Sequence, residues 1–177
     1  MNELNLDANI KANILIVDDQ ENNLIAMRQT LDSLNATIFL AHSGMEALQL
    51  LTEHEFAIIL LDIQMPGMDG FETAQLIRKN KRTENLPIVF VTAINRERVK
   101  EVKGFNIGEV DFLFKPVDPY ILQSKVQIFL DLYYQKNYQK HVKQELSNVR
   151  TELEKTQKKM QHLQIGLDDH NGSNYDK

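Results

Sequence analysis

The sequence predicts an α/β fold in which a five-stranded parallel sheet carries helices on both faces. One observation is the run at residues 56–61, six apolar residues without polar alternation, which is typical of a central strand covered on both sides. A second is that five short strand-like runs alternate with segments of helical periodicity. A length of 177 residues with 42% hydrophobic composition allows one globular domain plus an appendage.

The expected elements follow one another at short spacing. Apolar, β-branched runs predict strands at residues 13–17, 36–41, 56–61, 88–91 and 110–114. Apolar residues at helical spacing predict helices at 20–34, from a cap at Ser43, at 71–77, at 95–104 and from about 118 onward. Ser43 with Glu46 three residues later forms a capping-box pattern.

Composition excludes several classes of function. The chain has no cysteine, so disulfides, thiolate metal sites and a cysteine nucleophile are absent, as is common in a reducing cytoplasm. A formal charge of -5 gives no basic footprint for direct nucleic-acid binding. The N-terminus is polar, and no apolar run approaches the ~20 residues of a membrane helix. We therefore expect a soluble, cytoplasmic protein without membrane contact.

Polar side chains follow the predicted strands where those strands end. Asp18 and Asp19 follow the first strand, Asp62 the third, Thr92 the fourth and Lys115 the fifth. The carboxyl ends of parallel strands share one edge, where ligands bind in open α/β sheets. Crowded carboxylates repel unless a cation lies among them, and oxygen ligands select Mg²⁺, Mn²⁺ or Ca²⁺. Mg²⁺ suits a site that handles phosphate, and a carboxylate can attack phosphorus to form an acyl phosphate.

The same residues lie in motifs that carry a family resemblance. These are the Asp18-Asp19 pair, Leu61-Asp62, the loop at 65–70, Val91-Thr92-Ala93, and the segment at 111–116. In this order and spacing, over about residues 12–134, they make the chain resemble the receiver domain of two-component response regulators. The resemblance implies a flavodoxin-like fold with strand order 2-1-3-4-5.

The resemblance also implies a role for each site residue. Asp62 becomes the phospho-acceptor, and the Mg²⁺ ligands become Asp18, Asp19, Asp62 and the main-chain carbonyl of Gln64. By the same resemblance, the phosphate is sensed by Thr92 and Lys115, and Phe112 is the switch aromatic. The expected partner is a sensor histidine kinase or a phosphotransfer protein.

These residues distinguish three classes of function. We expect a signalling switch and not an enzyme, acting as a fragment of, or an adaptor for, a larger regulator. The alternative is a vestigial receiver that serves as a phosphorylation-independent interaction module. An aspartyl-phosphate phosphatase would need a second acid two residues after Asp62, where Gln64 stands.

Beyond the receiver, the sequence predicts a coiled-coil helix at residues 135–167. Apolar residues repeat every seven positions in two series, Val142, Val149, Thr156 and Leu163, and Leu146, Leu153, Met160 and Leu167. An upstream stripe at Leu122, Val126, Phe129 and Tyr133 has the same spacing but is shifted by one residue. We expect a parallel homodimer, with a tetramer left open by the choice of seam residues. Residues 1–11 and 168–177 are expected to be a disordered lead-in and tail.

Overall fold

The structure is a computed structural model that describes residues 11–93 and 110–172, with side chains described as far as residue 161. Its contacts divide the chain into two units, Met1–Tyr134 and Gln135–Lys177, and each is described by itself. The helix expected at 95–104 lies outside the described residues. So does the lead-in expected at 1–11, apart from residue 11.

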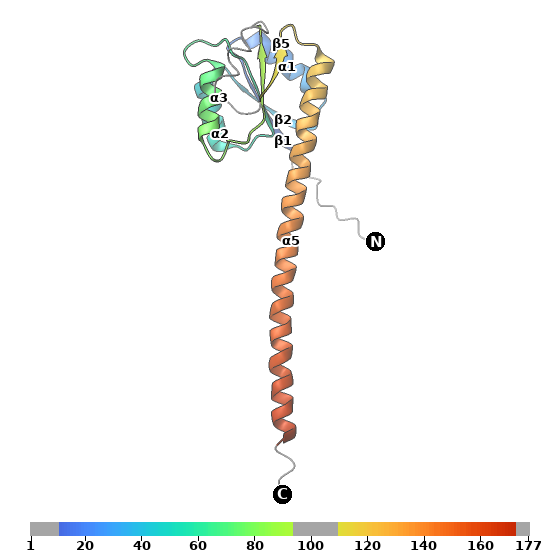
Figure 1. The fold of residues 1–177 in the computed structure, drawn as a ribbon. Coiled ribbons are helices and arrows are strands. Elements are labelled where there is room, and N and C mark those ends of the chain that lie inside the picture. The colour runs from blue at the N-terminus through green and yellow to red at the C-terminus, as the bar shows by residue number, and fades with distance from the viewer. Residues whose placement is uncertain (1–10, 94–109, 173–177) are drawn as a thin grey trace. The chain divides into compact units, whose positions relative to one another are not determined.

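Five strands form one parallel sheet in the order β2-β1-β3-β4-β5. They are β1 (Ala12–Val17), β2 (Ala36–Ala41), β3 (Ile58–Leu61), β4 (Ile88–Thr92) and β5 (Val110–Phe114). The register places Val17 opposite both Ala41 and Leu61, and Phe90 opposite both Leu61 and Phe112. The carboxyl ends of the central strands are therefore level along one edge (Figure 1). The predicted five-stranded parallel sheet and its strand order are confirmed.

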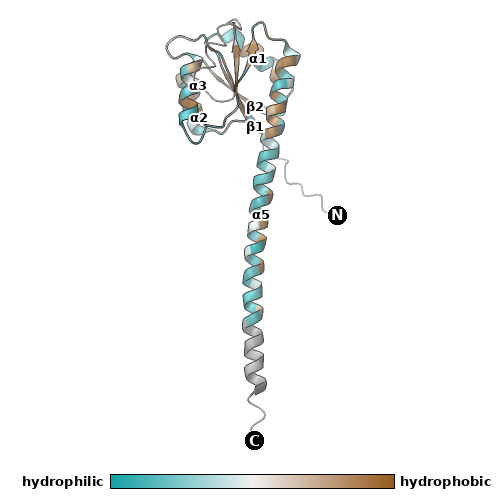
Figure 2. Cartoon of the chain, in the orientation of Figure 1, coloured by the Kyte–Doolittle hydropathy of each residue, from teal (hydrophilic) through white to brown (hydrophobic). Residues whose placement is uncertain are grey.

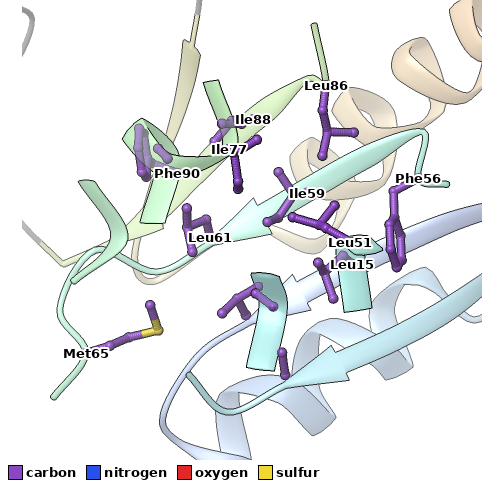
Figure 3. Packing of buried hydrophobic residues seen from close by; sticks show 14 of the residues in the cluster. Leu15, Leu51, Phe56, Ile59, Leu61, Met65, Ile77, Leu86, Ile88 and Phe90 are labelled. Carbon is purple, nitrogen blue, oxygen red and sulfur yellow. The ribbon is translucent and has the colours of Figure 1, made fainter. Parts of the chain in front are cut away.

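Helices α2 (Gly44–Glu53) and α3 (Gly70–Lys79) cover one face of the sheet. Their buried side chains, including Leu51 and Ile77, meet alternate residues of the central strands such as Ile59 and Phe90 (Figure 3). Full burial of an aliphatic or aromatic side chain of this size contributes about 1.5–3 kcal/mol. The run from Phe56 is apolar throughout because its other residues face the second layer.

The opposite face is covered by α1 (Glu21–Leu31) and by the first part of α5 (Pro119–Gly172). From α5, Leu122, Val126 and Leu130 are buried against this face. The Tyr134 hydroxyl accepts a hydrogen bond from the Ala12 N–H at 3.2 Å and donates one to the Asn35 carbonyl at 2.8 Å. The end of the first unit is thus attached to both β1 and β2.

Several element boundaries differ from the sequence prediction. Strand β3 begins at Ile58, where its pairing with β1 begins opposite Ile14; pairing with β4 begins at Ile59, whose N–H donates to the Pro87 carbonyl at 3.0 Å. Helix α1 ends at Leu31 rather than 34, where a turn closes through the Leu34 N–H and the Leu31 carbonyl. These residues remain in the core or at its edge, so the apolar pattern extends further than the regular backbone.

The predicted capping box at Ser43 is half correct. Ser43 Oγ accepts from the Glu46 N–H at 3.2 Å, as expected for an N-cap. The Glu46 carboxylate, however, accepts from the N–H of His42 at 2.7 Å, one residue before the cap. The complete capping box in the described residues is at α3, between Asp69 and Glu72.

Helix α5 continues to Gly172. The sequence predicted that the helix ends at residue 167 and that a disordered tail begins at 168, so the helix is five residues longer than predicted. Beyond residue 134 the described side chains are mostly hydrophilic, with isolated apolar positions (Figure 2). No described helix has an apolar stretch long enough to cross a bilayer. The coiled coil stays a prediction, because one chain is described.

His42 joins α1 and α2 through two carboxylates. Its Nε2 lies 2.7 Å from Glu21 Oε2, and its Nδ1 lies 3.4 Å from Glu46 Oε2. The hydrogen bond with Glu21 raises the pKa of His42 above 6.5; burial opposes this shift, and Glu46 adds to it. Because the folded-state pKa is raised, this contribution to stability is complete below about pH 6.5 and is lost as pH rises through the folded pKa.

We therefore predict that an NMR titration of the His42 ring gives a pKa above 6.5, and that Glu21→Gln lowers it. Glu53→Gln, on the same helix as Glu46 but not among the groups that shift the pKa of His42, is the control and should leave that pKa unchanged. A wild-type pKa at or below 6.5 would contradict the prediction.

Candidate functional site

The sheet places two buried acids side by side at its carboxyl edge. Asp18 follows β1 and its N–H donates to the Ala41 carbonyl at 3.1 Å. Asp62 follows β3 and its N–H donates to the Val17 carbonyl at 2.8 Å. Their exposed fractions are only 0% and 3%. Backbone pairing with the neighbouring strands therefore fixes both residues at this edge of the sheet.

Asp18 is the most fully hydrogen-bonded acid of the group. Its Oδ1 accepts from the Gln20 N–H and from Asn23 Nδ2, both at 2.9 Å. Its Oδ2 accepts from Lys115 Nζ at 2.6 Å. Asn23 is not among the residues predicted from the sequence, where its only signal is its position in the first turns of the helix after Asp18. This asparagine holds the carboxylate in one orientation.

Lys115 joins the ends of β1 and β3 to the end of β5. Its Nζ lies 2.6 Å from Asp18 Oδ2 and 3.4 Å from Asp62 Oδ1. Its backbone N–H donates to the carbonyl of Thr92, the last residue of β4, at 2.9 Å. Lys115 therefore brings the ends of four strands into one site, and its side chain remains 22% exposed.

Negative charge exceeds positive charge in this cluster. Oxygens of Asp18, Asp19 and Asp62 all lie within 4.8 Å of one another, while Lys115 is the cation paired with them. Burial raises the pKa of Asp62 from its ordinary value; Lys115 opposes that shift and Asp18 adds to it. A further positive charge in the cluster would therefore stabilise the ionised form of Asp62.

The donor set fits a hard divalent cation. Among the described residues, Asp19 Oδ1 is buried without a hydrogen-bond partner, and Asp62 Oδ1 is buried with only the 3.4 Å ion pair to Lys115. Buried polar atoms usually have hydrogen-bond partners, so these two oxygens fit a site for a bound cation. The three acids offer oxygens within 4.8 Å of one another, and Mg²⁺ takes carboxylate oxygens at about 2.1 Å. The side chains present therefore satisfy the preference of Mg²⁺ for oxygen ligands.

The loop after Asp62 is shaped by two glycines and a cap. Gly67 has a φ of +76°, in the left-handed region that glycine tolerates best. A Cβ on Gly70 would lie 2.2 Å from the Asp62 carbonyl oxygen and 2.8 Å from the Ile63 Cα. Asp69 caps α3 by accepting from the Glu72 N–H at 2.8 Å. Close packing of α3 against the Asp62 backbone therefore requires glycine at position 70.

The remaining predicted site residues have different positions. Thr92 is fully buried at the end of β4. Gln64 is exposed, two residues beyond Asp62. Phe112 is partly buried within β5, and its ring stacks on Phe90 with centroids 5.2 Å apart. Phe112 therefore belongs to an aromatic group on the α2–α3 face and is separate from the acid cluster.

Comparison with known proteins identifies the family to which this domain belongs. The family model of the response regulator receiver domain matches residues 14–127. The chain belongs to this family. Receiver domains are generally signalling modules rather than enzymes, and they interact with histidine kinases or phosphotransfer proteins.

The curated relatives are longer than this chain. A probable cyclic di-GMP phosphodiesterase of Vibrio cholerae is 39% identical over 66% of this chain and 26% of its own length. Response regulator PleD of Caulobacter vibrioides is 35% identical over 67% of this chain and 26% of its own length. The transcriptional regulatory protein SrrA of Staphylococcus aureus is 36% identical over 66% of this chain and 47% of its own length. This chain thus spans less than half of each of these three proteins.

Solved structures agree with the receiver assignment. The chemotaxis protein CheY4 of Vibrio cholerae has a TM-score of 0.63 at 28% identity, covering 68% of this chain and 99% of that one. A putative response regulator from Chloroflexus aurantiacus has a TM-score of 0.63 at 30% identity, covering 69% and 99%. These likenesses support the flavodoxin-like sheet and its level carboxyl edge.

The close approach at Gly70 leads to a stability prediction. Gly70→Ala should lower the free energy of unfolding by about 1–3 kcal/mol, because backbone atoms of Asp62 and Ile63 must move to admit the methyl group. Gly67→Asn is the control, since no atom lies within 4 Å of a Cβ there and asparagine tolerates positive φ. Urea denaturation would compare the two, and equal losses would refute the packing argument.

Proposed function

We propose that this protein is a Mg²⁺-dependent phospho-accepting receiver in which Asp62 takes a phosphoryl group from a histidine kinase or phosphotransfer protein. The observation that carries the proposal is the buried cluster of Asp18, Asp19 and Asp62 with Lys115 in ion-pair contact with two of the three acids. An acid that is buried, backbone-fixed and adjacent to a cation-binding set is arranged for attack on phosphorus.

In the proposed reaction, a carboxylate oxygen of Asp62 forms a bond to phosphorus as the bond from phosphorus to the donor's imidazole nitrogen breaks. The electron pair of that bond returns to the imidazole, and Asp62 becomes an acyl phosphate. Asp18, Asp19, Asp62 and the Gln64 main-chain carbonyl would hold Mg²⁺, which when bound supplies positive charge to the phosphoryl oxygens. Asp18 is kept in place for this role by its bonds to Gln20 and Asn23.

Lys115 and Thr92 are proposed to read the phosphorylated state. Lys115 would pair with a phosphoryl oxygen, and the Thr92 hydroxyl would donate to another. Because the Lys115 N–H is bonded to the Thr92 carbonyl at 2.9 Å, the ends of β4 and β5 would respond together. Phe112, two residues before Phe114 at the end of β5, is proposed as the aromatic whose packing on Phe90 changes with that response.

We predict that incubation with acetyl phosphate and Mg²⁺ adds one phosphoryl group, detected as an adduct of about 80 Da on intact-mass analysis of a carboxylate-phosphorylated chain. Asp62→Asn should abolish the adduct because an amide is not a nucleophile toward phosphorus. Chelation of Mg²⁺ should reduce it strongly, because the acidic cluster would then repel the donor.

Asp32→Asn, an exposed acid at the end of α1, is the matched control and should be phosphorylated like the wild type. An adduct on Asp62→Asn, or one indifferent to chelation, would refute the assignment. Absence of any adduct on the folded wild type would favour a vestigial receiver that acts as an interaction module.

The proposed output is a parallel coiled-coil dimer formed by α5. Its predicted seam residues Leu146, Val149, Leu153 and Met160 are 57–65% exposed in the single chain. A second helix packed on this stripe would remove them from water. In a parallel pair, Glu145 of one chain would face Arg150 of the other. Each now has only an exposed partner on its own helix, His141 at 3.6 Å and Glu154 at 3.3 Å.

We predict that Leu146→Glu combined with Leu153→Glu weakens self-association at least tenfold in sedimentation equilibrium, because charges would enter the seam. Asn148→Glu combined with Thr151→Glu places the same charges off the seam and is the control. Sedimentation also distinguishes a dimer from a tetramer. A wild-type chain that stays monomeric at tens of micromolar, phosphorylated or not, would refute the coiled-coil proposal.

The dimeric helix is proposed to pass the phosphorylation state to an effector, either further along a longer regulator or on a separate protein in the cytoplasm. Curated relatives are described as a phosphodiesterase and as transcriptional regulators, and each continues well beyond the matched receiver. The acidic composition gives this chain itself no basic surface for DNA, so the effector would supply the output activity.

A further inference from the structure

The half-buried side chain of Asn23 contacts both carboxylate oxygens of Asp18. Asn23 Nδ2 lies 2.9 Å from Asp18 Oδ1 and 3.1 Å from Asp18 Oδ2. A primary amide nitrogen carries two N–H donors, so this one group can serve both oxygens. Asp18 is fully buried, and a buried carboxylate that loses a donor is not readily compensated by water. The amide therefore matters more to Asp18 than an exposed contact would.

The start of α1 fixes the backbone of Asn23 independently of the acids. The Asn23 N–H donates to the Gln20 carbonyl at 3.0 Å, which closes the first turn of the helix. The next residue, Leu24, is fully buried in the layer that covers this face of the sheet. Asn23 therefore stays beside Asp18 even if the other partners of that carboxylate move.

One oxygen of Asp18, Oδ2, is shared by two donors that differ in charge. It accepts from Lys115 Nζ at 2.6 Å and from Asn23 Nδ2 at 3.1 Å. Lys115 Nζ also lies 3.4 Å from Asp62 Oδ1, whereas the Asn23 contacts in the described part of the chain go to Asp18. The amide is neutral, so it orients Asp18 without reducing the negative charge that attracts a divalent cation. A lysine or arginine at position 23 would compete with that cation.

We propose that Asn23 is a positioning residue for the phosphorylated state, which keeps the Asp18 carboxylate in place when Lys115 moves from Asp18 to the phosphoryl group on Asp62. This inference rests on the proposed phosphorylation of Asp62 and adds the residue that makes the exchange of partners possible. Before the exchange, Asp18 Oδ2 has two donors. After it, among the described residues, Asn23 is the donor that remains on this oxygen.

The geometry around Lys115 favours such an exchange. A phosphoryl group brings about -1.5 to -2 of charge, and Lys115 Nζ already lies within 3.4 Å of the oxygen beside which that charge would appear. The lysine side chain is 22% exposed, so it has room to turn. Without Asn23, however, Asp18 would keep only the Gln20 N–H, which donates to the other oxygen, Oδ1. Asp18 would then retain Lys115, and the lysine would be less available to the phosphoryl oxygens.

Beryllofluoride, an acyl-phosphate mimic, tests the proposal on the full-length chain. Asn23→Ala removes both hydrogen bonds from the amide to Asp18, and it should weaken beryllofluoride binding at saturating Mg²⁺ about tenfold, a loss typical of removing a partner of a metal-binding side chain. Binding would be measured by NMR titration, after a titration with Mg²⁺ alone has established saturation for each variant. Asn22→Ala is the matched control, because Asn22 is an exposed asparagine on the same turn of α1.

A second variant separates hydrogen-bond donation from packing. Asn23→Asp keeps the shape of the side chain but has no N–H donor, so it should bind beryllofluoride at least as weakly as Asn23→Ala. Wild-type binding by Asn23→Asp would show that position 23 acts through its shape and would overturn the proposal. Urea denaturation of each variant verifies that it is folded. A purely structural role would lower the free energy of unfolding and leave beryllofluoride binding by the folded chain unchanged.

The remaining outcomes are also decisive. Equal beryllofluoride binding by the wild type and Asn23→Ala overturns the exchange and leaves the proposed phosphorylation standing. A weakening that disappears at saturating Mg²⁺ overturns it as well, because Asn23 would then act on cation binding alone. A folded wild-type chain that binds no beryllofluoride at saturating Mg²⁺ overturns the proposed function, and this inference with it.

Discussion

The contact between Lys115 and the acids Asp18 and Asp62 is the interaction on which the site depends. It places one ammonium group among buried carboxylates that would otherwise repel one another, and it does so at 2.6 and 3.4 Å. One lysine does not balance three acids, and burial still raises the pKa of Asp62. The cluster therefore has an excess of negative charge. A bound divalent cation would reduce this excess, and a phosphoryl group would increase it.

The cluster can form because the strand ends are level. Asp18 follows β1 and Asp62 follows β3, and the last residues of these two paired strands lie opposite each other. Lys115 follows β5 and its N–H donates to the carbonyl of Thr92 at the end of β4. Gly70 lets α3 begin against the Asp62 carbonyl, so the loop after the acid is short and closely packed. Residues separated by nearly a hundred positions are therefore brought together by backbone hydrogen bonds, and the Lys115 ion pair then forms between buried or partly buried groups, where salt screens it little.

Helix α5 links the site to the proposed dimer. Leu122, Val126 and Leu130 of this helix are buried against the sheet, whereas Ile121, Ile128 and Leu132 are exposed. The Lys125–Asp111 ion pair connects the helix to β5, the strand that carries Phe112 and ends beside Lys115. A change in how β5 packs therefore has a short physical route to the helix pair.

The sequence by itself determined the sheet, its order by family resemblance, and the acids, threonine and lysine at the strand ends, because apolar runs and turn residues are local signals. The seven-residue repeat of apolar residues beyond residue 141 is also a property of the sequence alone. The partners that hold the site, above all Asn23 on Asp18 and the shared Lys115, were decided by tertiary structure, since they join residues from different elements. The same is true of α5, where only packing against the sheet decided that Leu122, Val126 and Leu130 are buried while the apolar residues Ile121, Ile128 and Leu132 are exposed.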